Sequence, residues 1–151
     1  MACVMVLLRL PPRIKVLEAL GAVADGRVRV VDEKNAEVVS SEGDRVYKVF
    51  VDLSRGVVSS SDNGTVYRGY IGYPIISFLM IKGVIPYDKK FSEALKGVRW
   101  RELNERYKKY SLVEQIVFAE AEKRGVSRRE LESYVEQVMS ILRRMRLFRE
   151  S

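Results

Sequence analysis

Short apolar stretches alternate with polar, turn-forming clusters through residues 27–71. Stretches of this length, rich in Val, Tyr and Ile and bounded by Gly, Ser, Asn and Asp, are typical of β-strands. Because the connections are short, consecutive strands are expected to pair as an antiparallel meander. The predicted strands span residues 27–31, 36–40, 45–53, 57–61 and 65–71.

The dipeptide Asn63-Gly64 separates the last two predicted strands. A two-residue type I′ turn needs positive φ at both central positions, and Asn and Gly reach it at the lowest steric cost. We therefore expect a hairpin in which Ser59 lies opposite Arg68.

Two helices are predicted within this first half. Residues 13–24 follow Pro11-Pro12 and carry an apolar face that includes Ile14, Leu17 and Leu20. Residues 74–82 are apolar all round, which predicts a buried helix. Residues 1–10 are predicted to form a buried strand, because their apolar run is far too short to span a membrane.

The second half of the chain shows helical periodicity and no strand pattern. Helices are predicted at residues 88–96, 99–110, 112–124 and 128–148. Two of them begin with a candidate capping box, in which a Ser and a Glu three residues later each satisfy a backbone amide of the other. These pairs are Ser111 with Glu114 and Ser127 with Glu130.

Together these patterns predict an α+β fold. An antiparallel meander of five to six strands would carry the helix at 13–24 and the buried helix at 74–82, followed by a helical C-terminal region. We expect a sheet domain over residues 1–86, with residues 87–151 packed on it, because no Gly/Ser-rich linker separates the halves.

The last predicted helix has apolar residues seven apart, at Leu131, Val138 and Met145. Such a seam packs either on the sheet domain or on a second copy of the same helix. A homodimer through this helix is therefore one of the expectations.

Composition removes several classes of site. The chain has no His and a single Cys, Cys3, which excludes His-ligated zinc, Ser-His-Asp triads and an internal disulfide. We expect no cofactor or metal, and the single cysteine favours a cytoplasmic location. The few Asn, Gln and Cys residues beside abundant Lys, Arg and Glu are typical of thermophile proteins.

The net charge of +7 is concentrated in the second half, where residues 88–151 hold 16 basic and 11 acidic side chains. Residues 89–110 combine basic residues with aromatic ones, a composition typical of nucleic-acid surfaces. Trp100, Leu103, Tyr107 and Tyr110 fall on one helical face, however, so the alternative is that these residues belong to the core. The candidate phosphate contacts are Lys89, Lys90, Lys96, Arg99 and Lys108.

A second candidate surface lies at the junction of the last two helices. The spacing of Ala121, Gly125 and Leu131 matches a helix-turn-helix, which would place Arg128 and Arg129 at the start of a recognition helix. Carboxylates at positions 130, 132 and 136 would face the phosphates, so a plain helical hairpin is the alternative.

The predicted hairpin offers a possible anion site at Ser59, Ser61, Arg68 and the helix start at Gly72. The glycines match no phosphate-loop fingerprint, so a simple bend is the alternative. Asp52 is the one carboxylate expected to be buried, paired with Arg68 or Arg45. No group is predicted to be catalytic.

The sequence therefore predicts a basic cytoplasmic protein that contacts DNA or RNA backbones through its C-terminal half, without a membrane segment. The alternative is a non-enzymatic interaction module that dimerises through the last helix. A phosphate-binding enzyme around Ser59, Asp62 and Arg68 is the third possibility.

Overall fold

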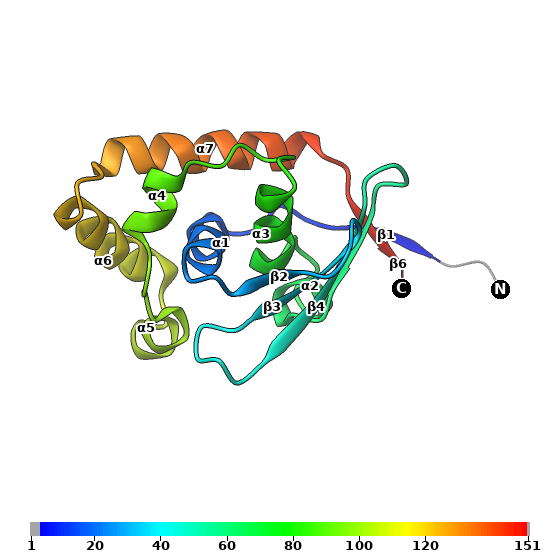
Figure 1. Ribbon diagram of the computed structural model, residues 1–151, viewed down its shortest axis with the longest axis horizontal. Coiled ribbons are helices and arrows are strands. Elements are labelled where there is room, and N and C mark those ends of the chain that lie inside the picture. Colours follow the sequence, from blue (N-terminus) through cyan, green and yellow to red (C-terminus); the bar gives the residue numbers. More distant parts are fainter. Residues whose placement is uncertain (1–3, 151) are drawn as a thin grey trace.

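A six-stranded sheet forms one side of the molecule and seven helices lie against it or beyond it in the computed structural model, which describes residues 4–150 (Figure 1). The strand order is β1-β6-β5-β4-β3-β2. All neighbours pair antiparallel except β5 and β6, which pair in parallel. The strands are β1 (Met5–Leu7), β2 (Val28–Val30), β3 (Asn35–Val39), β4 (Val46–Asp52), β5 (Val57–Ser60) and β6 (Phe148–Glu150).

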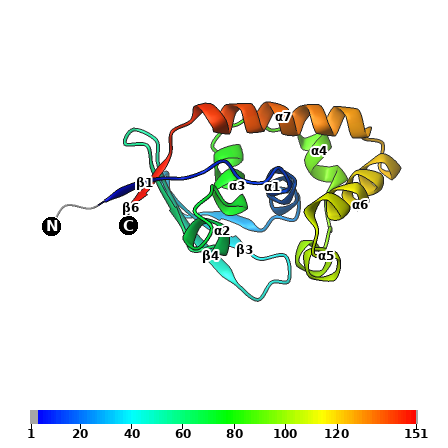
Figure 2. The same cartoon turned by 180° about the vertical axis from the view of Figure 1, so that it is seen from behind.

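The predicted α+β class is confirmed, and strands β2 to β5 form the expected meander. The sixth strand comes from a different place than the sequence pattern indicated. β6 follows the last helix and inserts between β1 and β5, which ties the end of the chain to its beginning (Figure 2).

Two helices hold the centre of the fold. α1 (Ile14–Ala24) and α3 (Tyr73–Ile81) pack against each other, and α3 also contacts β4. Pro74 stands in the first turn of α3, where a missing amide hydrogen costs nothing. Residues 74–80 are all buried, so the predicted buried helix is confirmed.

The remaining helices extend away from the sheet (Figure 1). α7 runs across α3 and α1 to α4 in both views. A single hydrophobic core runs from Leu8 to Leu147, so residues from both halves of the chain share it. These helices are α4 (Lys89–Ala94), α5 (Trp100–Tyr107), α6 (Tyr110–Lys123) and α7 (Arg128–Arg144).

The predicted Asn63-Gly64 hairpin is wrong. Residues 63–66 form a helical turn, α2 (Asn63–Val66), and Asp62 caps it by accepting hydrogen bonds from the Thr65 amide and hydroxyl at 3.1 and 2.9 Å. No strand follows at 65–71; Tyr70 makes only an isolated bridge to Arg9. The capping side chain of Asp62 competes with the type I′ turn and prevails.

The N-terminal strand is also different from the prediction. Among the described residues 4–10 of the expected strand, Met5–Leu7 form β1, and all three are exposed rather than buried. Cys3 lies outside the described residues.

The seam of the last helix faces the protein's own helices. Leu131 and Val138 are fully buried, Met145 packs partly buried on the same core, and α7 contacts α6 and α1. The apolar side chains of this seam therefore lie inside the chain's own core. The helix also ends at Arg144, before the predicted residue 148.

One of the two predicted capping boxes is confirmed. Ser127 and Glu130 form it at the start of α7. Ser111 lies inside α6, which begins one residue earlier at Tyr110 with Lys109 as its N-cap and no side-chain cap.

Across residues 4–150, no helix combines the length and apolar character that crossing a membrane requires.

Candidate functional site

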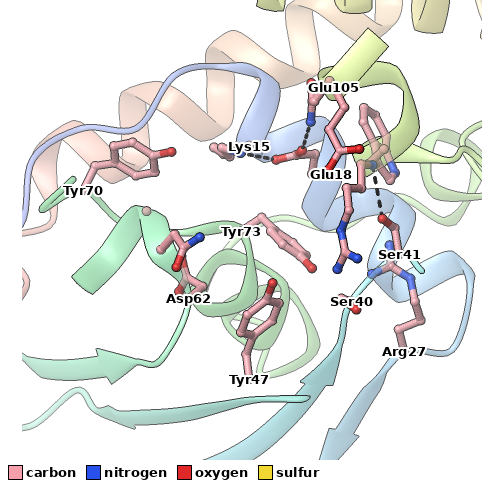
Figure 3. Close-up of a pocket in the computed structure, with 15 residues that line it drawn as sticks. Lys15, Glu18, Arg27, Ser40, Ser41, Tyr47, Asp62, Tyr70, Tyr73 and Glu105 are labelled. Carbon is pink, nitrogen blue, oxygen red and sulfur yellow. Dashed lines mark hydrogen bonds and ion pairs between the residues drawn. The ribbon is translucent and has the colours of Figure 1, made fainter. Parts of the chain in front are cut away.

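A polar pocket of about 290 Å³ lies where α1, α3 and α5 meet the turn between β3 and β4 (Figure 3). Its volume is close to that of small-molecule binding sites. Its wall carries three basic and three acidic side chains, together with tyrosine and serine hydroxyls. The wall is more polar than that of a packing defect between apolar elements.

α1 contributes an ion pair to the wall. Lys15 Nζ lies 2.8 Å from Glu18 Oε2, and Asn104 Nδ2 from α5 donates to Glu18 Oε1 at 2.9 Å. Burial lowers the pKa of Lys15, but the charge and hydrogen bond of Glu18 outweigh it and raise that pKa above the usual value. Lys15 and Glu18 are one turn apart on α1, so the helix itself sets their contact.

Trp100, at the start of α5, packs over α1. A Cβ placed at Gly21 would lie 2.6 Å from Trp100 Nε1, so only glycine allows the indole to lie this close. Trp100 is only 3% exposed and is the single tryptophan of the chain.

Two contacts fix α5 against the turn between β3 and β4. Arg101 donates through both terminal nitrogens to Asp44 at 2.8 and 2.7 Å, and its amide donates to Ser41 Oγ at 3.2 Å. Ser40 Oγ donates to the same Asp44 carboxylate at 2.9 Å. The Arg101 bond, which is the main cause, lowers the pKa of Asp44. These contacts hold one wall of the pocket in place.

Arg27 enters the pocket from the segment between α1 and β2. Its Nε lies 3.3 Å from Asp25 Oδ2, and its Nη1 donates to the carbonyl oxygen of Val39 at 2.8 Å. Arg27 Nη2 has no hydrogen-bond partner among residues 4–150. One face of the guanidinium therefore keeps an unused donor.

Tyr47 from β4 and Tyr73 from α3 stand edge to face, with ring centroids 6.2 Å apart. Figure 3 shows their hydroxyl ends turned toward one another inside the pocket. Burial raises the pKa of Tyr73 to about 12, although nearby Arg27 acts in the opposite direction. The phenol therefore stays neutral at physiological pH and can both donate and accept a hydrogen bond.

Asp62, Gly64 and Tyr70 close the far end. A Cβ at Gly64 would lie 2.4 Å from Tyr70 Cε1, and a Cβ at Gly72 would lie 2.2 Å from Asp62 Oδ2. Both glycines are required by close approach of a side chain rather than by a turn. Burial raises the pKa of Tyr70 to about 12.

Four buried polar atoms of the pocket wall lack a hydrogen-bond partner within the described part of the chain. One of them, Glu18 Oε2, is held by the ion pair with Lys15, and the other three have neither kind of partner. They are Arg27 Nη2, Trp100 Nε1 and Asn104 Oδ1. Buried polar groups are nearly always paired with protein or ordered water, so three such atoms around one pocket make it the leading candidate for a bound polar molecule.

A family model described as Uncharacterised conserved protein UCP014422 matches residues 8–148. The chain belongs to this family. The UCP014422 match includes every residue of the pocket wall, from Lys15 to Glu105. No curated protein and no solved structure matches the chain.

The seven predicted nucleic-acid contacts are distributed over α4, the segments that follow α4 and α5, and the start of α7. Three of them already pair with carboxylates: Lys90 with Glu130 at 3.0 Å, Arg99 with Glu102 at 3.4 Å and Arg128 with Glu132 at 3.0 Å. The other four are exposed and have no acidic partner among residues 4–150. These are Lys89, Lys96, Lys108 and Arg129.

Of the predicted aromatic core face, Trp100 is buried and Leu103 partly buried. Tyr107 and Tyr110 are exposed, so their assignment to the core is wrong. α5 ends at Tyr107, where Lys108 takes a left-handed conformation with φ of 53° and turns the chain away.

The predicted anion site is not assembled. Ser59 pairs with Phe50 across β4 instead of facing Arg68, and Ser61 Oγ accepts a hydrogen bond from the Lys48 amide. The Asp62 carboxylate lies against Gly72, where an anion was expected.

Asp52 is buried as predicted, but its partners are different. It accepts from Ser54 Oγ at 2.7 Å, and Lys34 Nζ lies 3.6 Å away, so neither Arg68 nor Arg45 pairs with it. Asp52 is not the one buried carboxylate, because Glu18 and Asp62 are buried too.

Proposed function

We propose that this protein binds a small polar molecule in the pocket between α1, α3 and α5. The observation that carries the proposal is the set of unpaired buried atoms, Arg27 Nη2, Trp100 Nε1 and Asn104 Oδ1. Leaving such a group unpaired costs about 1–3 kcal/mol. A ligand that offers both donors and acceptors offsets this cost and gains affinity from it.

The fixed geometry of the wall supports the same proposal. Lys15 with Glu18, Arg101 with Asp44, and Arg27 with Asp25 and Val39 are held by contacts within the protein. A site whose polar groups are already oriented loses little entropy when a ligand binds.

Two signals for binding are available in one experiment. The protein is mixed in turn with each of the twenty L-amino acids, succinate, putrescine and glucose, while the unfolding midpoint and the fluorescence of Trp100 are measured. A compound at a hundredfold excess over its Kd stabilises the protein by about 2.7 kcal/mol. For a chain of this size that raises the midpoint by about 5–10 °C.

The control pair is Tyr73→Phe and Tyr67→Phe. Tyr73 presents its hydroxyl to the pocket, whereas Tyr67 is 80% exposed and lies outside it. We expect Tyr73→Phe to weaken binding and Tyr67→Phe to leave it unchanged. If none of the probes alters either signal, the pocket holds only water and the proposal is rejected.

Nucleic-acid binding is the second candidate function, and the four unpaired basic residues Lys89, Lys96, Lys108 and Arg129 favour it. Because these residues lie on separate segments, namely α4, the turns that follow α4 and α5, and α7, the proposed mode is contact with phosphates without base recognition. A cytoplasmic location, favoured by the single cysteine, belongs to the same proposal.

This candidate is tested by affinity for a short duplex and a single strand across a salt series. Changing Lys89, Lys96 and Lys108 together to Ala should weaken binding to every oligonucleotide and flatten the salt slope by about one unit per lost contact. The matched control replaces Lys90, Arg99 and Arg128, which carboxylates already neutralise. Equal effects of the two triples would reject the proposed contacts.

A further inference from the structure

The charges around the pocket define which small molecule fits it. Each basic side chain of the wall already has a carboxylate partner: Lys15 has Glu18, Arg27 has Asp25 and Arg101 has Asp44. The wall also holds two carboxylates, those of Asp62 and Glu105, that pair with no basic side chain among residues 4–150. The pocket wall therefore carries an excess of carboxylates over unpaired basic side chains.

This balance disfavours a polyanion and favours a positive group on the ligand. Asn104 Oδ1 adds a buried acceptor on the same side as Glu105, one residue along α5. The amide orientation follows from the hydrogen bond that Asn104 Nδ2 donates to Glu18, which leaves Oδ1 as the free atom. An ammonium group supplies the three donors that these acceptors lack.

Beside β4, the pocket wall instead favours a negative group on the ligand. Arg27 Nη2 is a buried, unused donor, and the hydroxyls of Tyr47 and Tyr73 point into the space next to it (Figure 3). Guanidinium and phenol donors together are suited to a carboxylate. Figure 3 draws Glu105 and Arg27 on different sides of the pocket, so the two charged ends of a ligand can be bound separately.

We infer that the ligand is a small zwitterion of the α-amino acid type, with its carboxylate at Arg27, Tyr47 and Tyr73 and its ammonium group at Asn104 and Glu105. The inference rests on the proposed function and specifies its ligand class. The volume of about 290 Å³ accommodates a single free amino acid.

The test compares an amino acid with relatives that lack one charge. For each L-amino acid that changes Trp100 fluorescence, affinity is measured by titration calorimetry beside its N-acetyl derivative and its carboxamide. Removing either charged end should weaken binding about tenfold or more, because it leaves Asn104 Oδ1 or Arg27 Nη2 unpaired inside the wall.

Variants then show which pocket residues contact the ammonium end of the ligand and which contact its carboxylate end. Glu105→Gln should lower the affinity for the amino acid several-fold and leave the affinity for its N-acetyl derivative unchanged. Tyr73→Phe should lower the affinity for both compounds. Glu122→Gln is the matched control, because Glu122 is an exposed residue of α6 outside the pocket. Calorimetry reports affinity directly and does not depend on the fluorescence of Trp100.

The outcomes separate the two proposals. If the N-acetyl derivative or the carboxamide binds as tightly as the parent amino acid, the zwitterion inference is overturned. It is also overturned if only succinate, putrescine or glucose binds, and the pocket then remains a ligand site. If no compound binds, both proposals fail together.

Discussion

Gly21 illustrates how single residues shape the candidate site. Gly is unfavourable in the middle of a helix by about 0.5–1 kcal/mol relative to Ala. It is retained in α1 where a Cβ would lie 2.6 Å from Trp100 Nε1. The close approach of the indole to the helix therefore depends on this one missing methyl group.

We predict that Gly21→Ala destabilises the protein by about 1–3 kcal/mol despite the better helix propensity of Ala, because the indole must move. The emission of Trp100 should shift as well. Chemical denaturation followed by fluorescence measures both effects. In a double-mutant cycle, Trp100→Leu should remove most of the added cost, and strict additivity would contradict the packing explanation.

Tyr73 predicts a pH dependence of stability. Its pKa rises from 10.0 to about 12 in the folded protein, so the native state holds the proton more tightly than the unfolded state. Its stabilising contribution is complete below pH 10 and is lost as the pH rises toward 12, by about 2 kcal/mol. In urea titrations, Tyr73→Phe should reduce the slope of stability between pH 10 and 12, whereas Tyr67→Phe should not.

At the scale of secondary-structure elements, side-chain caps decide where helices begin. Asn63-Gly64 has the composition of a hairpin turn, yet Asp62 caps a helical turn there instead. The turn signal is local, whereas Gly64 is held by the ring of Tyr70, six residues away. Sequence pattern alone therefore predicted the four strands of the meander correctly and failed at this dipeptide.

The two predicted capping boxes provide a matched comparison. Ser127→Ala removes the hydroxyl that accepts from the Glu130 amide, so we expect a loss of about 1 kcal/mol in the free energy of unfolding. Ser111→Ala changes a residue inside α6 that caps nothing, so its effect should be within about 0.5 kcal/mol. Equal losses in thermal denaturation would contradict the assigned helix starts.

At the scale of the whole molecule, α7 and β6 close the fold by returning the C-terminal end to the sheet. Periodicity predicted α7 and its apolar seam but not its partner, because a seam looks the same whether its own chain or a second copy covers it. β6 is only three residues long, too short for an alternation pattern to be recognised.

The site was harder to predict than the fold, because a sequence pattern does not show which distant residues come together. Lys15, Arg27, Tyr47, Tyr73 and Asn104 come from distant parts of the chain and form no motif. One signal was present in the sequence: Glu18 follows Ile14 by four residues, which places a carboxylate on the apolar face of α1. A buried charge of this kind needs partners and indicates a polar site.

Val138 distinguishes the closed fold from a dimer. The side chain is fully buried in the chain's own core, so Val138→Asp buries an unpaired charge and should unfold the protein. Circular dichroism should show lost helix, and sedimentation should show no folded monomer. Val31→Asp, at a position 59% exposed, should remain folded. A folded monomer released from a dimer by Val138→Asp would contradict the observed packing of α7.

The central claim, that the pocket binds a small polar ligand, is tested most directly by nuclear magnetic resonance of the Trp100 indole. The chain has one tryptophan, so its ¹H–¹⁵N spectrum contains one indole signal, and that proton belongs to an unpaired nitrogen of the pocket wall. We predict a saturable shift of this signal on titration with an L-amino acid, reduced in Tyr73→Phe and retained in Tyr67→Phe. An indole signal that stays in place with every amino acid, succinate, putrescine and glucose would contradict the claim.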